Sequence, residues 1–228
     1  MPSAVAEAQT IMQARIRDAL VAAVSAAWLR LPGYDEEHVA GWLEQVVPMV
    51  LAAQSASANM TDAYLAHFLG RQPLGVSASA VTGAALRAGA TPQQVYRRPF
   101  VNVWTALSKG QDFELAVRAG MARAGDLAAT DVQLAHRAAL RSVQLKDQRI
   151  QAWSRVPDAN ACAFCRKIAG AKVHSADAMP LHPGCGCTLE PLTEPVPVAT
   201  ALPEGVAVNQ HGELGPILGD PAHAFTTV

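Results

Sequence analysis

The segment TDVQLAHRAALRSVQLKDQRIQAW, residues 130–153, decides the fold class. Its apolar residues recur at helical spacing, at Val132, Ala135, Ala139, Val143 and Ile150. This spacing places them on one face of an α-helix, and the stretch RSVQLKDQR supplies a polar face. The sequence therefore predicts an amphipathic helix that begins at Thr130 or Asp131 and runs to about Trp153.

Similar patterns precede this segment. A first helix is expected to end at Pro32-Gly33, and Asp35 is suited to cap the next one. That second helix should be kinked by Pro48, and a separate helix through Met60 should end near Gly70. Thr91-Pro92 is typical of a helix start, and two further helices are expected at about 99–109 and 112–124.

The composition supports a mainly α fold. Hydrophobic residues make up 50% of the 228 residues and charged residues 16%, which excludes an intrinsically disordered chain. Much of the apolar content is alanine, a strong helix former. No apolar run approaches the roughly 18–20 residues of a membrane-spanning helix. The first 20 residues also lack the pattern of a secretory signal, so we expect a soluble protein that is made in a cytoplasm.

The net charge of −1 hides an uneven distribution. Residues 1–86 carry four basic and seven acidic side chains, residues 87–172 carry fourteen and six, and residues 173–228 carry none and six, giving −3, +8 and −6. A basic middle segment can face nucleic acid, whereas an acidic tail cannot neutralise phosphates. The candidate DNA-facing residues are Arg98, Arg118, Arg123, Arg137, Arg141 and Arg149. The alternative is that these arginines only solvate the outer faces of long helices.

The cysteines form the clearest motif. Cys162-Ala-Phe-Cys165 is followed after nineteen residues by Cys185-Gly-Cys187, and His182-Pro183 lies directly before the second pair. This spacing is typical of a structural zinc site, in which two pairs of ligands close around one tetrahedral ion. Gly184 and Gly186 would give the backbone the freedom that ligands at positions i and i+2 demand.

Five candidate donors compete for four coordination positions. The favoured sets are Cys162, Cys165 and Cys187 with either His182 or Cys185, and His174 is a weaker sixth candidate. A disulfide would need an oxidising compartment, which nothing in the sequence indicates. A redox-active pair usually begins a helix in a βαβ setting, which this sequence does not predict. Four protein ligands would leave no open position for a catalytic water, so the module is interpreted as a structural clip.

Three regions follow from these patterns. We expect an α-helical body over residues 1–157, a Cys/His zinc module with a small β-hairpin over residues 158–190, and an extended, proline-rich acidic tail over residues 191–228. Eight of the fifteen prolines lie beyond residue 179, which favours polyproline-type structure in the tail.

The segments WSRVPDANACAFCRKIAG and PLHPGCGCTLEPL resemble the C-terminal module of phage Mu F-like (MuF) minor head proteins of tailed bacteriophages. The alanine-rich helical body and the tail VNQHGELGPILGDPAHAFTTV are similar to members from actinobacterial phages. Cys162, Cys165, His182, Cys185 and Cys187 match the family motif, and no catalytic residue comes with them.

The resemblance implies a virion component that is made in the host bacterial cytoplasm and lies inside the capsid. It implies association with the portal protein and with the major capsid or scaffold protein, and a part in head assembly and in DNA packaging or exit. Packaged DNA is a possible non-specific partner, and a structural Zn²⁺ is the implied cofactor. No membrane partner is implied.

Two alternative functions stay open, a capsid maturation protease and a zinc-clipped DNA-binding protein. Against an enzyme, the sequence contains no G-x-S-x-G and no phosphate-binding glycine motif. His67 and His136 lie within helical patterns and are interpreted as surface or core residues and not as general bases. We therefore expect a protein that acts by assembly and binding.

Overall fold

The chain, described here from a computed structural model, has a mainly helical body and a small antiparallel sheet, as the sequence predicts. The structure describes residues 2–76, 78–163, 165–166, 169, 173–174 and 185–194. His182 and most of the predicted acidic tail, residues 195–228, lie outside the described residues.

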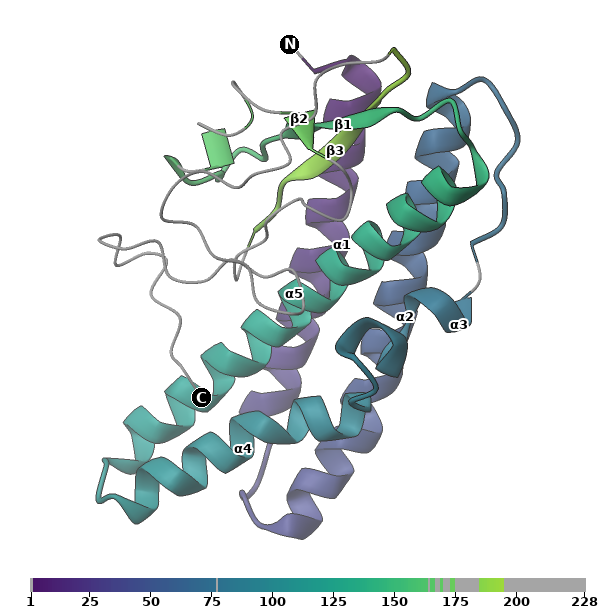
Figure 1. The fold of residues 1–228 in the computed structure, drawn as a ribbon. Coiled ribbons are helices and arrows are strands. Elements are labelled where there is room, and N and C mark those ends of the chain that lie inside the picture. The colour runs from purple at the N-terminus through teal and green to yellow at the C-terminus, as the bar shows by residue number, and fades with distance from the viewer. Residues whose placement is uncertain are drawn as a thin grey trace.

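Four long helices build the body: α1 (Ala4–Leu29), α2 (Glu36–Phe68), α4 (Pro92–Ser108) and α5 (Phe113–Lys146). The short α3 (Ala78–Val81) and the 3₁₀ helix η1 (Gly83–Arg87) connect α2 to α4. In Figure 1, α5 runs diagonally across the bundle, and it packs against α1, α2 and α4. No helix in the described part of the chain is long and apolar enough to cross a membrane.

Two of the predicted helix starts are confirmed. The Asp35 side chain accepts a hydrogen bond from the backbone N–H of His38 at 3.1 Å and caps α2. Thr91 caps α4 by accepting from the backbone N–H of Gln94, whose side chain accepts the Thr91 N–H in return. These contacts satisfy backbone donors that have no partner within the first helical turn.

The predicted break before residue 60 is wrong, because α2 continues without interruption across Pro48 to Phe68. The predicted break in the last helix is also wrong, since α5 is one helix of 34 residues. Asp131 does not begin a helix. It is buried in the middle of α5, where it accepts hydrogen bonds from Tyr96 Oη and Arg87 Nε, both at 2.9 Å.

The predicted end of this helix at Trp153 is wrong as well. α5 ends at Lys146, and Trp153 lies in the strand β1 (Ala152–Val156). No glycine or proline marks this end in the sequence. Instead, the Asp147 carboxylate accepts the backbone N–H of Arg149 at 3.2 Å, which fixes a turn in place of a further helical turn.

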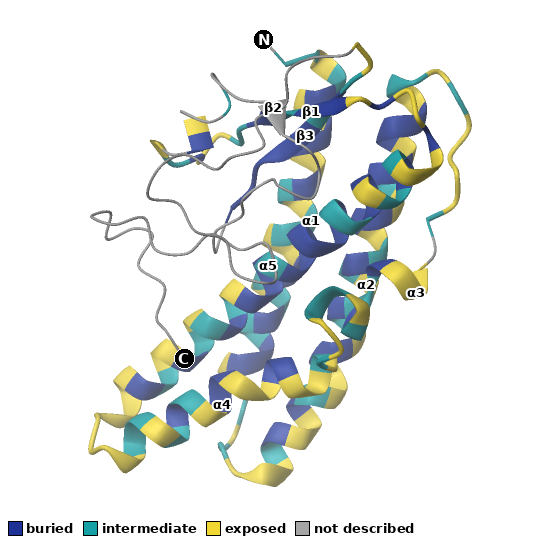
Figure 2. Ribbon diagram, viewed as in Figure 1, coloured by how far each residue is buried: buried dark blue, intermediate teal, exposed yellow. Residues whose placement is uncertain are grey.

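Two hydrophobic clusters divide the interior. The larger one joins α1, α2, α4 and α5 around four aromatic rings, those of Trp28, Trp42, Tyr96 and Phe100. The second joins the ends of α2 and α5 to the sheet and includes three cysteines as well as Leu140 and Trp153. Figure 2 shows this buried interior continuing from the helices into β1 and β3.

A buried polar group lies between α1, α2 and α5. The Gln13 amide donates to the carbonyl of Ser57 at 3.1 Å, and Thr61 Oγ1 lies 2.8 Å from His136 Nδ1. Burial, with the nearby charge of Arg137, lowers the pKa of His136 to about 3, so the imidazole is neutral at physiological pH. The sequence predicted that His136 and His67 are each a surface or a core residue, and the structure places His136 in the core and His67 on the surface.

The sheet has the order β2-β1-β3 and is antiparallel throughout. β1 pairs with β2 (Val173–His174) on one side and with β3 (Thr188–Leu192) on the other. Figure 1 shows the strands beside the N-terminal part of α1. β1 lies within residues 1–157, predicted as the helical body, and β3 extends past residue 190, so the sheet ties together the three predicted regions.

Two glycines of α5 give a matched test of this packing. A Cβ at Gly120 would lie 2.6 Å from Val103 Cγ2 and 2.8 Å from Trp28 Cζ2, whereas a Cβ at Gly125 would meet Val21 Cγ1 at an ordinary 3.5 Å. Gly120→Ala should therefore lower the free energy of unfolding, because overpacking costs about 1–3 kcal/mol. Gly125→Ala should raise it by about 0.5–1 kcal/mol, the gain in helix propensity. Chemical denaturation measures both, and equal stabilisation by the two variants would contradict the packing described.

Candidate metal centre

Three cysteine sulfurs meet in the interior beside the sheet. The Sγ atoms of Cys165, Cys185 and Cys187 all lie within 4.8 Å of one another, and all three residues are buried. Cys185 and Cys187 directly precede β3, whereas Cys165 follows β1 by nine residues. The pairing of β1 with β3 therefore brings together two segments that are twenty residues apart in the sequence.

The spacing of the sulfurs fits a tetrahedral metal ion. With Zn–S bonds of about 2.3 Å, two ligand sulfurs of a tetrahedral site lie about 3.8 Å apart. Sulfurs that lie within 4.8 Å of one another need only small side-chain movements to reach this geometry. The described residues thus bring together three of the five predicted ligands.

The other two predicted ligands are Cys162, which the structure describes, and His182, which it does not. Cys162 is half-buried, and its Sγ accepts the backbone N–H of Cys165 at 3.4 Å. Its side chain therefore points toward the backbone of Cys165. It lies outside the group of three sulfurs. His182 lies outside the described residues, as does the side chain of His174. The favoured ligand sets, Cys162, Cys165 and Cys187 with either His182 or Cys185, stay a prediction. Of the two alternatives, the described residues place Cys185 with Cys165 and Cys187.

Arg155 lies against the sulfurs. It is 2% exposed, and its Nη1 atom is 3.2 Å from Cys165 Sγ and 3.9 Å from Cys185 Sγ. Burial by itself would lower the pKa of Arg155, but the neighbouring cysteines outweigh this effect and the pKa is raised. The sequence patterns predict no role for Arg155. The available signal was its place in residues 152–156, where three of the other four residues are apolar, shortly before the first cysteine pair.

The thiols also influence one another. The pKa of Cys165 is raised well above its ordinary range by hydrogen bonds with Cys185 and Cys187 and by burial. A metal ion binds thiolates, so it must displace these protons. Metal binding at this centre is therefore expected to release protons and to weaken as the pH falls.

Gly186 joins the cysteine loop to the helical body. Arg17 of α1 donates to Asp158 through Nη1 at 3.2 Å, and both side chains are largely buried. A Cβ at Gly186 would overlap the Asp158 carboxylate and the Arg17 guanidinium. Gly186 is therefore required for this close approach, a different reason from the backbone freedom that the sequence indicated.

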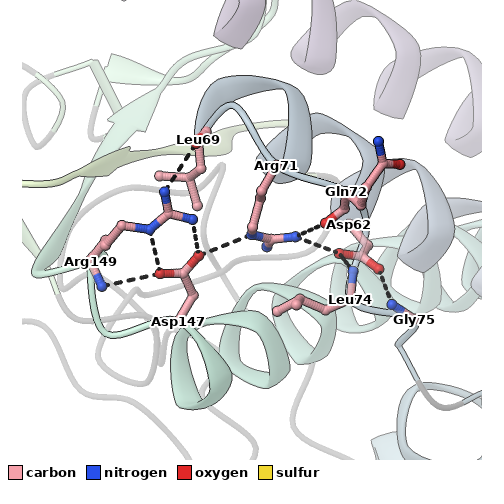
Figure 3. Close-up of polar contacts among 8 residues, drawn as sticks. All are labelled: Asp62, Leu69, Arg71, Gln72, Leu74, Gly75, Asp147 and Arg149. Carbon is pink, nitrogen blue, oxygen red and sulfur yellow. Dashed lines mark hydrogen bonds and ion pairs between the residues drawn. The ribbon is translucent and has the colours of Figure 1, made fainter.

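A second ion-pair group, drawn in Figure 3, holds the chain where it enters β1. Asp147, directly after α5, accepts from Arg71 Nε at 2.9 Å and from Arg149 Nε and Nη2 at 2.9 and 2.7 Å. Arg71 also lies 3.8 Å from Asp62, which accepts the backbone N–H groups of Leu74 and Gly75. This group fastens the end of α5 to the end of α2 and so fixes the start of the sheet.

The predicted DNA-facing arginines do not share one environment. Arg98, Arg118, Arg141 and Arg149 are exposed, whereas Arg123 and Arg137 are half-buried. Arg149 is held by Asp147, and Arg137 and Arg141 lie one helical turn apart on α5. A role of these side chains in DNA contact stays a prediction.

A family model described as VG15 protein matches residues 1–207, a range that includes the helices, the sheet and all four cysteines. The chain belongs to the VG15 protein family. This is a phage viral-gene family, so the VG15 chain is a phage protein, as the resemblance implied. Neither the curated proteins nor the solved structures compared with this VG15 protein include a match.

Asp147 gives the VG15 protein a testable dependence on pH. Hydrogen bonds from Arg149, together with those from Arg71, hold the pKa of Asp147 well below its ordinary range. Asp147→Asn should lower the free energy of unfolding at pH 7 by about 1–3 kcal/mol, because it removes a charged acceptor. Since the folded-state pKa is depressed, this difference should shrink as the pH falls below about 3.9, the ordinary carboxyl value.

Urea denaturation between pH 7 and pH 2 measures that difference. Asp18→Asn is the control, because Asp18 is an exposed partner of Arg17 and its loss should cost less than about 1 kcal/mol. A gap between wild type and Asp147→Asn that stays constant down to pH 2 would contradict the role assigned to Asp147.

Proposed function

We propose that this VG15 protein is a phage minor head protein that lies inside the capsid at the portal vertex and acts in head assembly and in DNA packaging or exit. The observation that carries the proposal is the match of residues 1–207 to a phage protein family. The resemblance of the cysteine segments to those of MuF minor head proteins supports the narrower role. The portal protein and the major capsid or scaffold protein are the proposed partners, with packaged DNA as a non-specific one.

The cysteine centre is proposed to bind one structural Zn²⁺. Buried thiolates favour soft or borderline ions such as Zn²⁺ over Mg²⁺ or Ca²⁺, which prefer oxygen ligands. Cys165, Cys185 and Cys187 would hold the ion, with Cys162 or His182 as the fourth ligand. Bound zinc would supply cross-linking of the loop and no catalysis, because four protein ligands leave no position for a substrate.

The sheet gives the acidic part of the chain a fixed starting point. The backbone N–H of Gln151 donates to the carbonyl of Leu192 at 2.8 Å, so β3 is paired with the β1 edge up to its last residue. Residues 193–228 carry four acidic side chains and no lysine or arginine. We infer that this segment contacts a basic surface of the portal, while the helical body supplies a rigid support.

A role in assembly also accords with the surroundings of His136. Its Nδ1 atom contacts Thr61, and the residue is 1% exposed inside the helical bundle. A substrate would have to open the bundle to reach this imidazole. The proposed function therefore assigns His136 to the core and not to proteolysis.

Binding to the portal protein of the same phage tests the proposal. The purified chain should be retained by immobilised portal, and the quadruple variant Glu194→Gln, Glu204→Gln, Glu213→Gln, Asp220→Asn should bind more weakly, with a smaller dependence on salt. Arg98→Gln with Arg118→Gln is the matched control, because these substitutions alter exposed charges on the helical body.

Three results would contradict the assignment. The first is a failure of the wild-type chain to bind portal, together with its absence from purified virions. The second is defined cleavage of capsid or scaffold protein that a single serine substitution abolishes, which would indicate a maturation protease. The third is tight binding to DNA, with a steep dependence on salt, in a chain that does not bind portal; this would indicate a DNA-binding protein.

A further inference from the structure

Arg155 is a buried charged side chain that lies directly against the cysteine centre. Its Nη1 atom is within hydrogen-bonding distance of Cys165 Sγ, at 3.2 Å, and lies 3.9 Å from Cys185 Sγ. The residue is 2% exposed, so its charge has little contact with solvent. A buried guanidinium is stable only where negative charge compensates it. Thiolates at Cys165, Cys185 and Cys187 would supply that charge.

The sheet fixes the position of Arg155. It lies in the central strand β1, in register with Leu189 of β3, and the next residue pairs with Thr188, which directly follows Cys187. The same strand pair thus places the guanidinium and two of the three sulfurs. Its planar fork of five N–H donors can bond more than one sulfur in a fixed geometry, whereas a lysine ammonium has three donors and no fixed fork.

We propose that Arg155 is a positioning residue of the metal centre: it donates hydrogen bonds to ligand sulfurs and compensates their charge, and so strengthens the binding of a thiophilic divalent cation without touching it. The inference rests on the metal site of the proposed function. Three thiolates around a divalent ion carry a net charge of −1, which one guanidinium neutralises. A fourth thiolate from Cys162 would leave −1 overall, and a neutral His182 would leave zero.

Co²⁺ and Zn²⁺ binding to the full chain, kept reduced, tests the inference. Co²⁺ is followed by its thiolate charge-transfer absorption, and Zn²⁺ by competition with a chromophoric chelator. Arg155→Met should weaken binding by roughly 10–100-fold, the usual effect of losing an outer partner of a metal ligand. Arg155→Lys keeps the positive charge, whereas Arg155→Gln keeps an N–H donor but no charge. The lysine variant should therefore lose less metal affinity than the glutamine variant.

Arg87→Met is the matched control. Arg87 is a largely buried arginine that binds the carboxylate of Asp131 within the helical body and not the cysteines. Its loss should lower the stability of the fold and leave the affinity for Co²⁺ within about twofold of wild type, because additive effects are expected at independent sites. The control separates a general loss of stability from an effect on the ligands.

The outcomes separate the two proposals. The first outcome is that wild type binds about one Co²⁺ and Arg155→Met binds it with equal affinity. This would overturn the role of Arg155 and leave the metal site intact. Wild-type chain that binds neither Co²⁺ nor Zn²⁺ would overturn both. If Arg155→Met does not fold, the comparison of Arg155→Lys with Arg155→Gln decides: a lysine variant that binds no better than the glutamine variant would contradict charge compensation.

Discussion

The close approach of three sulfurs to one guanidinium is the constraint on which the sheet and the cysteine loop depend. Cys165, Cys185 and Cys187 come from two chain segments, and Arg155 comes from the strand between the helical body and the first of them. A buried cation is costly alone, and thiolates at these three cysteines would compensate its charge. A bound metal ion would convert this contact into a cross-link between the two segments.

The sheet is not independent of the helices. Its residues Trp153 and Leu189 share one hydrophobic cluster with Tyr64 of α2 and Leu140 of α5. Polar contacts reinforce this attachment at two places, the ion pair of Arg17 with Asp158 and the group around Asp147. The helices therefore provide a surface on which a three-stranded sheet, too small to fold alone, can be completed by the cysteine centre.

The helical fold class and the cysteine cluster could be predicted from the sequence because both depend on local spacing. Periodic apolar residues can be recognised within a short window of sequence. Helix caps such as Asp35 and Thr91 bond backbone groups only three residues ahead. The end of α5 could not be predicted in the same way. Asp147 lies in a polar stretch of the sequence, and Asp131 lies at a predicted helix start, but each binds an arginine from a distant segment. Asp147 accepts from Arg71, and Asp131 accepts from Arg87. The role of Arg155 was missed for the same reason, since only the strand pairing brings it to the sulfurs.

Hydrogen exchange of backbone amides, measured on the zinc-loaded chain and after treatment with a chelator under reducing conditions, tests the central claim most directly. If the metal centre holds the sheet, removal of the ion should abolish protection in β1 and β3 while α1, α2, α4 and α5 stay protected by their own core. Unchanged protection of β1 and β3 after the metal has been removed would contradict the account, and so would loss of protection throughout the helices.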